Sequence, residues 1–181
     1  QHDEGVVLLI DEIDKSDEEF EAFLLEILSA FQVTIPEIGT IKAKTPPIVF
    51  LTSNATRDLG DALKRRCLHL FIPLPDAKLE EQIVATRVPE IEARLRRKLV
   101  SFVQQLRDLD LKKLPSISET IDWARVLVLL HAEDLTSDMV RETLNVLLKF
   151  EEDIQGADRK IPEMLRQAEN VAEHGLHATT F

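Results

Sequence analysis

The sequence has little cysteine, little glycine and no long apolar run. Its single cysteine, Cys67, excludes an intrachain disulfide and suits a reducing compartment, so we expect a cytoplasmic protein. Five glycines in 181 residues are few for a globular protein, and they favour long helices with short connections. No apolar run is longer than that of Val6–Ile10, whereas a membrane span needs ~18 residues, so we expect no membrane partner.

An excess of basic residues is also absent. Lysine and arginine number 22 against 33 acidic residues, which gives a net charge of −11. Residues 1–31 hold ten of the acids and one base, so the acidity is local. Because a basic footprint is missing, we expect no nucleic-acid partner. One basic run, Arg94, Arg96, Arg97 and Lys98, is typical of a solvated helix face, with phosphate binding as the alternative.

The first part of the chain alternates between strand and helix patterns. Continuous apolar, β-branched runs are typical of parallel strands covered on both faces. Three runs predict strands: Val6–Ile10, Ile48–Thr52 and Leu68–Ile72. Ser16, with Glu19 three residues later, predicts a capped helix, and Gln32–Lys42 predicts a β-hairpin. Strands alternating with helices predict a parallel α/β sheet.

Beyond residue 76 only helical patterns remain. Four segments carry them: residues 78–106 with a break at Pro89, Ser116 to Leu130, Thr136 to Phe150, and Pro162 to near Gly175. Ser116 and Glu119 predict a second capping box. We therefore expect an α/β part over residues 1–76, followed by an all-helical part over residues 77–181.

Acidic residues follow the first predicted strand directly, as Asp11 and Glu12. In open α/β sheets, ligands lie beyond the carboxyl ends of the strands. There an aspartate can hold the water shell of Mg²⁺, and a glutamate can polarise the water that attacks a γ-phosphate. Asn54 ends the next buried strand, where its amide could orient the same water. The alternatives are a solubilising turn for the acids and a turn or cap residue for Asn54.

One group of basic residues and one further arginine add to this pattern. Lys64, Arg65 and Arg66 end a short predicted helix, where they stabilise the helix dipole or supply an arginine finger across a subunit interface. Arg125 follows Trp123 early in a predicted helix, where it either forms a surface salt bridge or reaches a nucleotide.

In this order, the motifs resemble the AAA+ ATPases, and more closely the MoxR family in its branch associated with carbon monoxide dehydrogenase maturation. The resemblance covers nearly the whole chain. It rests on VVLLIDEIDKSDEEFEAFLLEIL, FQVTIPEIGTIKA, IVFLTSN, DALKRRCLHLFIPLPD, PSISETIDWARVLVLL and LTSDMVRETLNVLLKFEEDI. It implies a remnant of a P-loop AAA+ core, with parallel strands, helices and one hairpin insert, followed by an all-α lid.

The resemblance also implies roles for single residues. Asp11 would be the Walker B residue that holds Mg²⁺, Glu12 the catalytic base and Asn54 the sensor 1 residue. Arg66 would be the arginine finger, with Arg65 as the alternative. Arg125 would be the sensor 2 arginine of the lid, with ATP bound between core and lid.

The resemblance further implies a hexameric ring that uses ATP hydrolysis for chaperone-like remodelling of a protein substrate, cofactor insertion or complex assembly. Relatives often act with a von Willebrand factor A domain protein. In relatives the hairpin faces a ring pore or a partner.

One family motif is absent, the phosphate-binding Gly-x-x-x-x-Gly-Lys-Ser/Thr loop. We therefore expect the chain to be the C-terminal portion of a longer ATPase, with an incomplete sheet and little ATP binding of its own. The alternative is a non-catalytic protein-interaction module with a vestigial nucleotide site. A third class, a clamp-loader or helicase relative that acts on nucleic acid, is disfavoured by the acidic charge.

Overall fold

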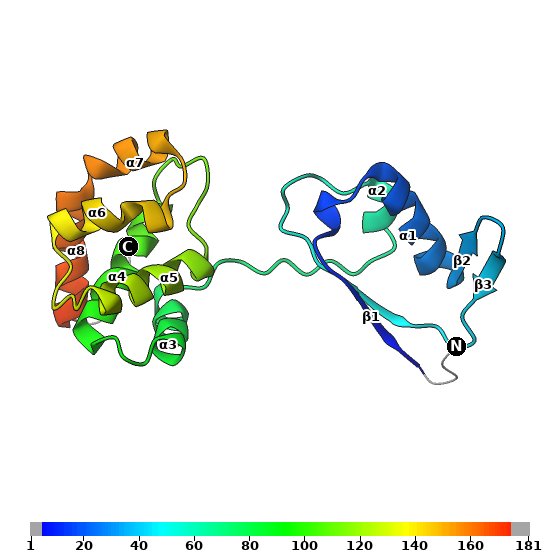
Figure 1. The fold of residues 1–181 in the computed structure, drawn as a ribbon, viewed down its shortest axis with the longest axis horizontal. Coiled ribbons are helices and arrows are strands. Elements are labelled where there is room, and N and C mark those ends of the chain that lie inside the picture. The colour runs from blue at the N-terminus through cyan, green and yellow to red at the C-terminus, as the bar shows by residue number, and fades with distance from the viewer. Residues whose placement is uncertain (1–4, 175–181) are drawn as a thin grey trace. The chain divides into compact units, whose positions relative to one another are not determined.

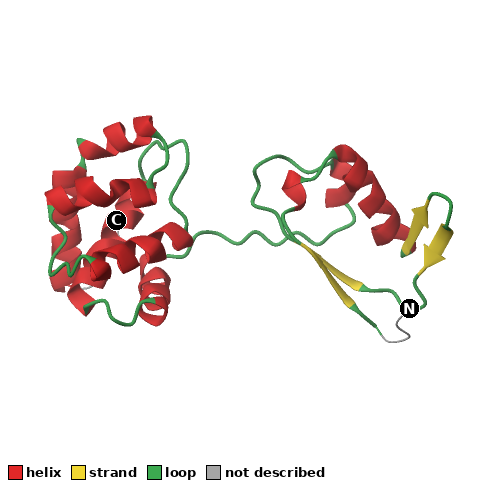
Figure 2. Ribbon diagram, in the orientation of Figure 1, coloured by secondary structure: helices red, strands yellow, loops and turns green. Residues whose placement is uncertain are grey.

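The computed structural model describes residues 5–174, and the chain divides into two compact units, Gln1–Phe71 and Ile72–Phe181. The first unit is mixed α/β and the second is built from helices (Figures 1 and 2).

The first unit holds two small sheets. Strand β1 (Val7–Ile10) pairs in parallel with β4 (Ile48–Leu51), and β2 (Gln32–Ile35) forms an antiparallel hairpin with β3 (Gly39–Lys42). The parallel pairing and the hairpin confirm the sequence prediction. A single 3₁₀ turn, η1 (Ile13–Lys15), and two helices, α1 (Glu18–Ala30) and α2 (Asp61–Lys64), complete the unit.

Helix α1 begins one residue later than its sequence pattern predicts. The side chain of Asp17, not that of Ser16, accepts a hydrogen bond from the Phe20 amide at 2.8 Å and caps the helix. The Ser16 hydroxyl instead donates to the Ile13 carbonyl at 2.7 Å and ends the 3₁₀ turn. The predicted capping box at Ser16 is therefore wrong, because the preceding turn uses that hydroxyl.

Glu26 of α1 holds the hairpin at its first strand. Its carboxylate accepts hydrogen bonds from Gln32 Nε2 at 2.8 Å and from the Thr34 hydroxyl at 2.6 Å. These bonds, the one from Thr34 foremost, lower the pKa of Glu26. The hairpin is thus tied to α1 by side chains as well as by the short connection at Phe31.

One face of the parallel sheet is open to solvent. Val7 and Leu9 of β1 are 66% and 62% exposed, and their register partners Ile48 and Phe50 are 61% and 57% exposed. The opposite face packs toward a small core that contains Ile13, Leu24 and Leu63. The prediction of strands covered on both faces is therefore wrong, because α1 and α2 contribute to a core on one face only.

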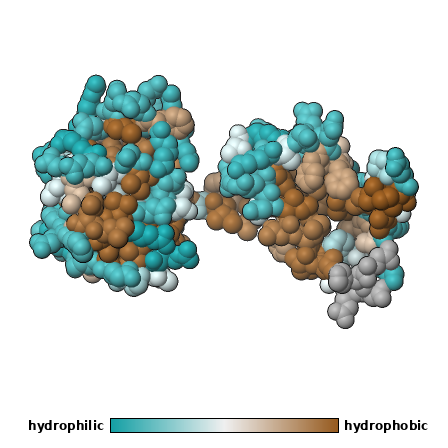
Figure 3. Space-filling model, viewed as in Figure 1, coloured by the Kyte–Doolittle hydropathy of each residue, from teal (hydrophilic) through white to brown (hydrophobic). Residues whose placement is uncertain are grey.

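The third predicted strand, Leu68–Ile72, is wrong, because these residues form no strand in the structure. Its apolar side chains are almost fully exposed, at 102% for Leu68 and 79% for Leu70. Strand structure requires a hydrogen-bonded neighbour, and each described sheet has two strands that pair only with each other. The brown areas over the first unit in Figure 3 show its exposed hydrophobic surface.

The described helices of the second unit are α3 (Ala77–Arg87), α4 (Ala93–Arg107), α5 (Ile117–Leu129), α6 (Ser137–Leu147), α7 (Glu151–Asp158) and α8 (Ile161–His174). The predicted break at Pro89 is confirmed, because it falls in the connection between α3 and α4. The predicted end of the helix from Thr136 to Phe150 is wrong, because α6 ends at Leu147. Leu148 leaves it in extended conformation and is buried, so that tertiary packing overrides the helical pattern.

A single large core holds the second unit together. Its largest side chains, Trp123 and Phe102, are fully buried with ring centroids 5.5 Å apart. Such a pair contributes about 0.5–1.5 kcal/mol beyond the area it buries. The Trp123 indole donates a hydrogen bond to the Thr143 hydroxyl at 2.8 Å, which satisfies the polar atom of a buried ring.

The capping box at the start of α5 is confirmed. The Ser116 amide donates to Glu119 Oε2 at 2.9 Å, and the Ser116 hydroxyl accepts from the Ser118 amide at 3.2 Å. We predict that Ser116→Ala lowers the free energy of unfolding by about 1 kcal/mol, measured by urea denaturation. Ser118→Ala is the matched control, because that side chain is exposed. Equal losses in both variants would contradict the capping role.

Candidate functional site

Polar side chains converge where β1 and β4 end. Asp11 and Glu12 follow β1, and Asn54 follows β4, which lies beside β1 in parallel. Asn54 Nδ2 donates a hydrogen bond to Glu12 Oε1 at 3.0 Å. The expected proximity of Glu12 and Asn54 is therefore present in the fold, although residue 54 is 42 positions away in the sequence.

Glu12 adopts a left-handed backbone conformation, with φ 52° and ψ 46°. This conformation costs a non-glycine residue roughly 1–2 kcal/mol, so surrounding contacts must hold it. One such contact is the Glu12 amide, which donates to the Thr52 hydroxyl at 3.0 Å. The same hydroxyl donates to Asp11 Oδ1. Thr52, which sequence reasoning missed, thus links the two acids to β4, and its place beside Asn54 was the available signal.

Lys15 donates a hydrogen bond to the second carboxylate oxygen of Glu12. Its Nζ lies 2.8 Å from Glu12 Oε2, and this hydrogen bond raises the pKa of Lys15. Both oxygens of Glu12 therefore have a donor, Asn54 on one and Lys15 on the other. The Glu12 side chain is still 44% exposed, so water reaches it.

Asp14 is the buried acid of this region, at 2% exposure. Its carboxylate accepts hydrogen bonds from the Thr56 hydroxyl at 2.5 Å, the Thr56 amide at 3.0 Å and the Asn54 amide at 3.1 Å. The bonds from Thr56, ahead of that from Asn54, hold the pKa of Asp14 well below its usual range. Sequence reasoning missed Asp14, because nothing in its spacing separates it from the other acids of residues 1–31.

The acids fit a magnesium ion that arrives with a phosphate ligand better than a resident metal. No group of three or more histidine, cysteine or acidic side chains with metal-binding geometry occurs among residues 5–174. Mg²⁺ is commonly held by one or two carboxylates together with substrate phosphates and water. Asp11, exposed at the strand end and hydrogen-bonded to Thr52, can supply one such carboxylate.

The two candidate finger residues differ in their contacts. Arg66 donates to the Ser29 hydroxyl at 2.7 Å and to the Ala62 carbonyl at 2.8 Å, so its guanidinium lies against its own unit. Arg65 is exposed at the end of α2, and its side chain makes no hydrogen bond or ion pair within the described part of the chain.

Arg125 lies on α5 in the second unit. Its side chain is 51% exposed, and its Nη1 pairs with Asp122 Oδ1 at 3.0 Å, one helical turn earlier. An exposed pair of this kind contributes little to stability, about 0–1 kcal/mol. The Arg125 guanidinium could therefore leave Asp122 for another partner at little cost.

The basic run on α4 forms ion pairs within the second unit. Lys98 lies 2.8 Å from Asp134 and 2.5 Å from Glu169, and its side chain is 5% exposed. Arg94 also pairs with Glu169. The interpretation of the run as a solvated face is therefore wrong for Lys98, because the (i, i+4) spacing turns it toward α8.

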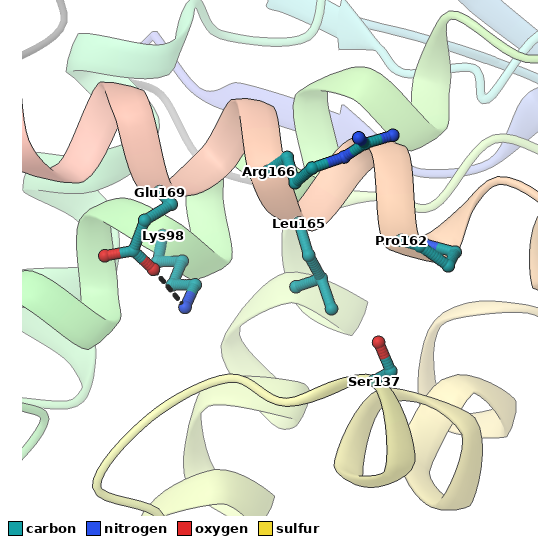
Figure 4. A pocket seen from close by; sticks show the side chains of 6 residues that line it. All are labelled: Lys98, Ser137, Pro162, Leu165, Arg166 and Glu169. Carbon is teal, nitrogen blue, oxygen red and sulfur yellow. Dashed lines mark ion pairs between the residues drawn. The ribbon is translucent and has the colours of Figure 1, made fainter.

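A hollow of about 620 Å³ lies beside Lys98, lined also by Ser137 and by Pro162, Leu165, Arg166 and Glu169 of α8 (Figure 4). Lys98 and Glu169 meet at one end and Ser137 lies at the other. Lys98 already has two carboxylate partners, so this buried cation is not available to a ligand in the hollow.

The Lys98 pair predicts an acid-dependent loss of stability. The hydrogen bond from Lys98 lowers the pKa of Glu169 below its ordinary value of 4.5. A lowered pKa contributes stability that is present above the unfolded value and is lost as the pH falls through the folded one. We predict that Glu169→Gln is less stable than wild type at pH 7 and that the difference shrinks below about pH 4.5.

Urea denaturation at several pH values measures this difference. Glu163→Gln on the same helix is the control, because Glu163 is exposed. A wild-type advantage over Glu169→Gln that stays constant from pH 7 to pH 3 would contradict the assignment.

No known family model matches the sequence, and no curated protein matches it either. Among the described helices, none has both the length and the apolar character needed to cross a bilayer.

Proposed function

We propose that the chain is the Walker B-to-lid portion of a MoxR-type AAA+ ATPase, and that Asp11, Glu12 and Asn54 belong to its hydrolysis site. The observation that carries the proposal is the 3.0 Å hydrogen bond between Asn54 Nδ2 and Glu12 Oε1 at the carboxyl ends of two parallel strands. A carboxylate and an amide at this edge of a sheet suit the positioning of one water molecule.

The proposed chemistry is attack of water on the γ-phosphate of ATP, which yields ADP and inorganic phosphate. Glu12 accepts the proton of the attacking water, and Asn54 orients that water and the carboxylate. Asp11 holds the Mg²⁺ that accompanies ATP, and the ion supplies charge neutralisation at the phosphates. The strained backbone of Glu12 is consistent with a catalytic position, because such strain gathers at functional sites.

The remaining roles follow from the resemblance. Arg66 acts as the arginine finger in a neighbouring subunit of a hexameric ring, which requires it to leave Ser29, and Arg65 is the alternative. Arg125 senses the γ-phosphate. Hydrolysis drives remodelling of a protein substrate, with a von Willebrand factor A domain protein as a possible partner class, in the cytoplasm.

The absence of a phosphate-binding loop from the 181 residues gives the proposal its first test. A P-loop supplies backbone amides and a lysine to the β- and γ-phosphates, and without them Asp11 and Glu12 have no phosphate anchored nearby. We predict that the 181 residues alone bind a fluorescent ATP analogue weakly or not at all. A form that carries the loop ahead of β1 is the control and is expected to bind. Stoichiometric nucleotide on the 181 residues would contradict the prediction.

A second candidate function is a protein-interaction module with a vestigial site. The exposed apolar face of Val7, Leu9, Ile48 and Phe50 favours it, because such faces mark interaction surfaces. A further apolar hollow of about 420 Å³ lies between β1, α1 and the hairpin, lined by residues that include Leu8, Ile27, Phe31 and Ile41. A loop-bearing form that binds no nucleotide would support this candidate over the ATPase.

A further inference from the structure

The Asp14 carboxylate joins two segments that are 40 or more residues apart. It lies in η1, two residues after Glu12, and it is 2% exposed. Oδ1 accepts from the Asn54 amide at 3.1 Å, while Oδ2 accepts from the Thr56 amide at 3.0 Å and from the Thr56 hydroxyl at 2.5 Å. All three donors belong to the irregular segment that follows β4.

Beyond Asp14, the segment is anchored by Arg57, whose Nη2 donates to the Ser16 carbonyl at 2.6 Å and whose Nη1 pairs with Glu21 at 2.5 Å. Ala55 adopts a left-handed backbone with φ 55°, and its amide donates to the Ser53 hydroxyl at 3.0 Å within the same turn. Asn54 and Thr56 are exposed residues, outside any helix or strand. The backbone amides of Asn54 and Thr56, however, both donate to one buried carboxylate, so Asp14 is the side chain that holds the backbone of the turn itself.

The Asn54 residue is therefore held at two points of the same short stretch. Its backbone amide is bound to Asp14, and its side-chain amide is bound to Glu12 Oε1 at 3.0 Å. Asp14 and Glu12 flank Ile13, whose amide donates to the Thr52 carbonyl at 3.0 Å and fixes the turn to β4. Moving the Asp14 contact would move the Asn54 side chain relative to Glu12.

We propose that Asp14 is a positioning residue, which fixes the Asn54 turn so that the Asn54 amide stays on the Glu12 carboxylate. Its catalytic consequence rests on the proposed ATPase function, whereas its effect on the Asn54–Glu12 contact does not. Asp14 itself accepts only from its own chain and has no position for substrate, because both of its oxygens are occupied and buried.

The test is the NMR signal of the Asn54 side-chain amide in isotope-labelled protein of the full 181 residues. Glu12→Ala defines the signal of an Asn54 amide that lacks its acceptor. We expect Asp14→Ala to shift the Asn54 Nδ2 protons to the same position, and to remove the hydrogen-exchange protection of the Asn54 and Thr56 backbone amides. Asp14→Asn keeps one acceptor oxygen, so it is expected to restore part of the wild-type signal.

Asp153→Ala is the matched control. Asp153 is a buried acid in the second unit that accepts from the Lys112 amide at 3.0 Å, so its loss tests general destabilisation. We expect the Asn54 signals to be unchanged in this variant. If Asp14→Ala lowers the melting temperature but leaves the Asn54 side-chain signals at their wild-type position, Asp14 is only structural and the proposal is overturned. It is also overturned if Glu12→Ala leaves those signals unchanged. Asp14→Asn keeps the test valid if Asp14→Ala does not fold.

The catalytic arm uses the loop-bearing form. There Asp14→Ala is expected to lower kcat by as much as about 100-fold with little change in the KM for ATP, because a misplaced orienting group weakens the chemical step rather than binding. Partial recovery of kcat in Asp14→Asn is the expected rescue. An unchanged kcat with a raised KM would overturn the positioning role in catalysis. If the wild type hydrolyses no ATP while the NMR shifts appear, the proposed ATPase fails and the Asp14 assignment stands.

Discussion

Glu12→Gln in a loop-bearing form is expected to lower the rate of ATP hydrolysis by about 100- to 10,000-fold, the usual loss when a general base is removed. Glutamine keeps the size of the side chain and an oxygen that can accept the bond from Asn54 Nδ2, but it cannot take a proton from water. Nucleotide affinity should change only a few-fold, because Glu12 is proposed to act on water and not on the phosphates. Phosphate release and fluorescent-nucleotide binding measure the two effects.

Glu19→Gln serves as the matched control for this variant. Glu19 is an exposed acid in the first turn of α1 and makes the same change of charge. Its hydrolysis rate should equal that of wild type. A Glu12→Gln protein that hydrolyses ATP at the wild-type rate would contradict the assignment of Glu12 as base. Loss of binding together with hydrolysis would assign Glu12 to nucleotide binding instead.

Arg107→Met is expected to lower the free energy of unfolding of the second unit by about 3–5 kcal/mol, because it leaves a buried carboxylate without its cation. Glu80 is fully buried, and the Arg107 guanidinium meets it with two bonds, Nη1 to Oε2 at 2.7 Å and Nη2 to Oε1 at 2.8 Å. Gln104 and the Thr120 hydroxyl donate to the same carboxylate at 2.6 and 2.8 Å. This network joins α3, α4 and α5.

Trp123 fluorescence during urea denaturation reports on this loss, since the sole tryptophan of the chain lies in the core of the second unit. Arg141→Met is the control, because Arg141 is 44% exposed and pairs with the exposed acids Asp138 and Asp158. Its expected cost is about 0–1 kcal/mol. Replacing Glu80 and Arg107 together by methionine should recover much of the loss. Similar costs for Arg107→Met and Arg141→Met would contradict the importance of burial.

Much of the fold follows from local patterns in the chain. The alternation of apolar runs predicts β1, β4 and the hairpin, and Ser116 with Glu119 predicts the start of α5, because these signals lie within a few neighbouring residues. One failure is a choice between two neighbouring caps. Ser16 and Asp17 are equally good caps in the sequence, and only the use of the Ser16 hydroxyl in η1 decides between them.

Burial of the strands and the pairing of Leu68–Ile72 could not be predicted for a different reason. Burial and pairing both depend on which other elements pack against a strand. A run of apolar residues has the same sequence pattern whether or not a partner strand is present. Val7 and Leu68 are as apolar as any core residue, yet they are 66% and 102% exposed. Lys98 shows the converse, because a basic run conceals one buried cation whose partners, Asp134 and Glu169, are distant in sequence.

The candidate site divides in the same way. Asp11, Glu12 and Asn54 could be singled out because they lie just beyond the ends of two predicted strands, and parallel strands bring their carboxyl ends together. Thr52 had only the weak signal of its place at the same strand end, and Asp14 had none, since the importance of both comes from hydrogen bonds across 40 or more residues. Residues that support the candidate site are therefore less visible in the sequence than those that end its strands.

The central claim is that the ends of β1 and β4 form a Mg²⁺-dependent ATP hydrolysis site, and phosphate release from ATP by wild-type protein in a loop-bearing form tests it most directly. We predict release over many turnovers that stops when EDTA removes Mg²⁺. Protein that binds ATP and Mg²⁺ but releases no phosphate, with or without a candidate protein partner, would contradict the claim and would leave the interaction module as the better account.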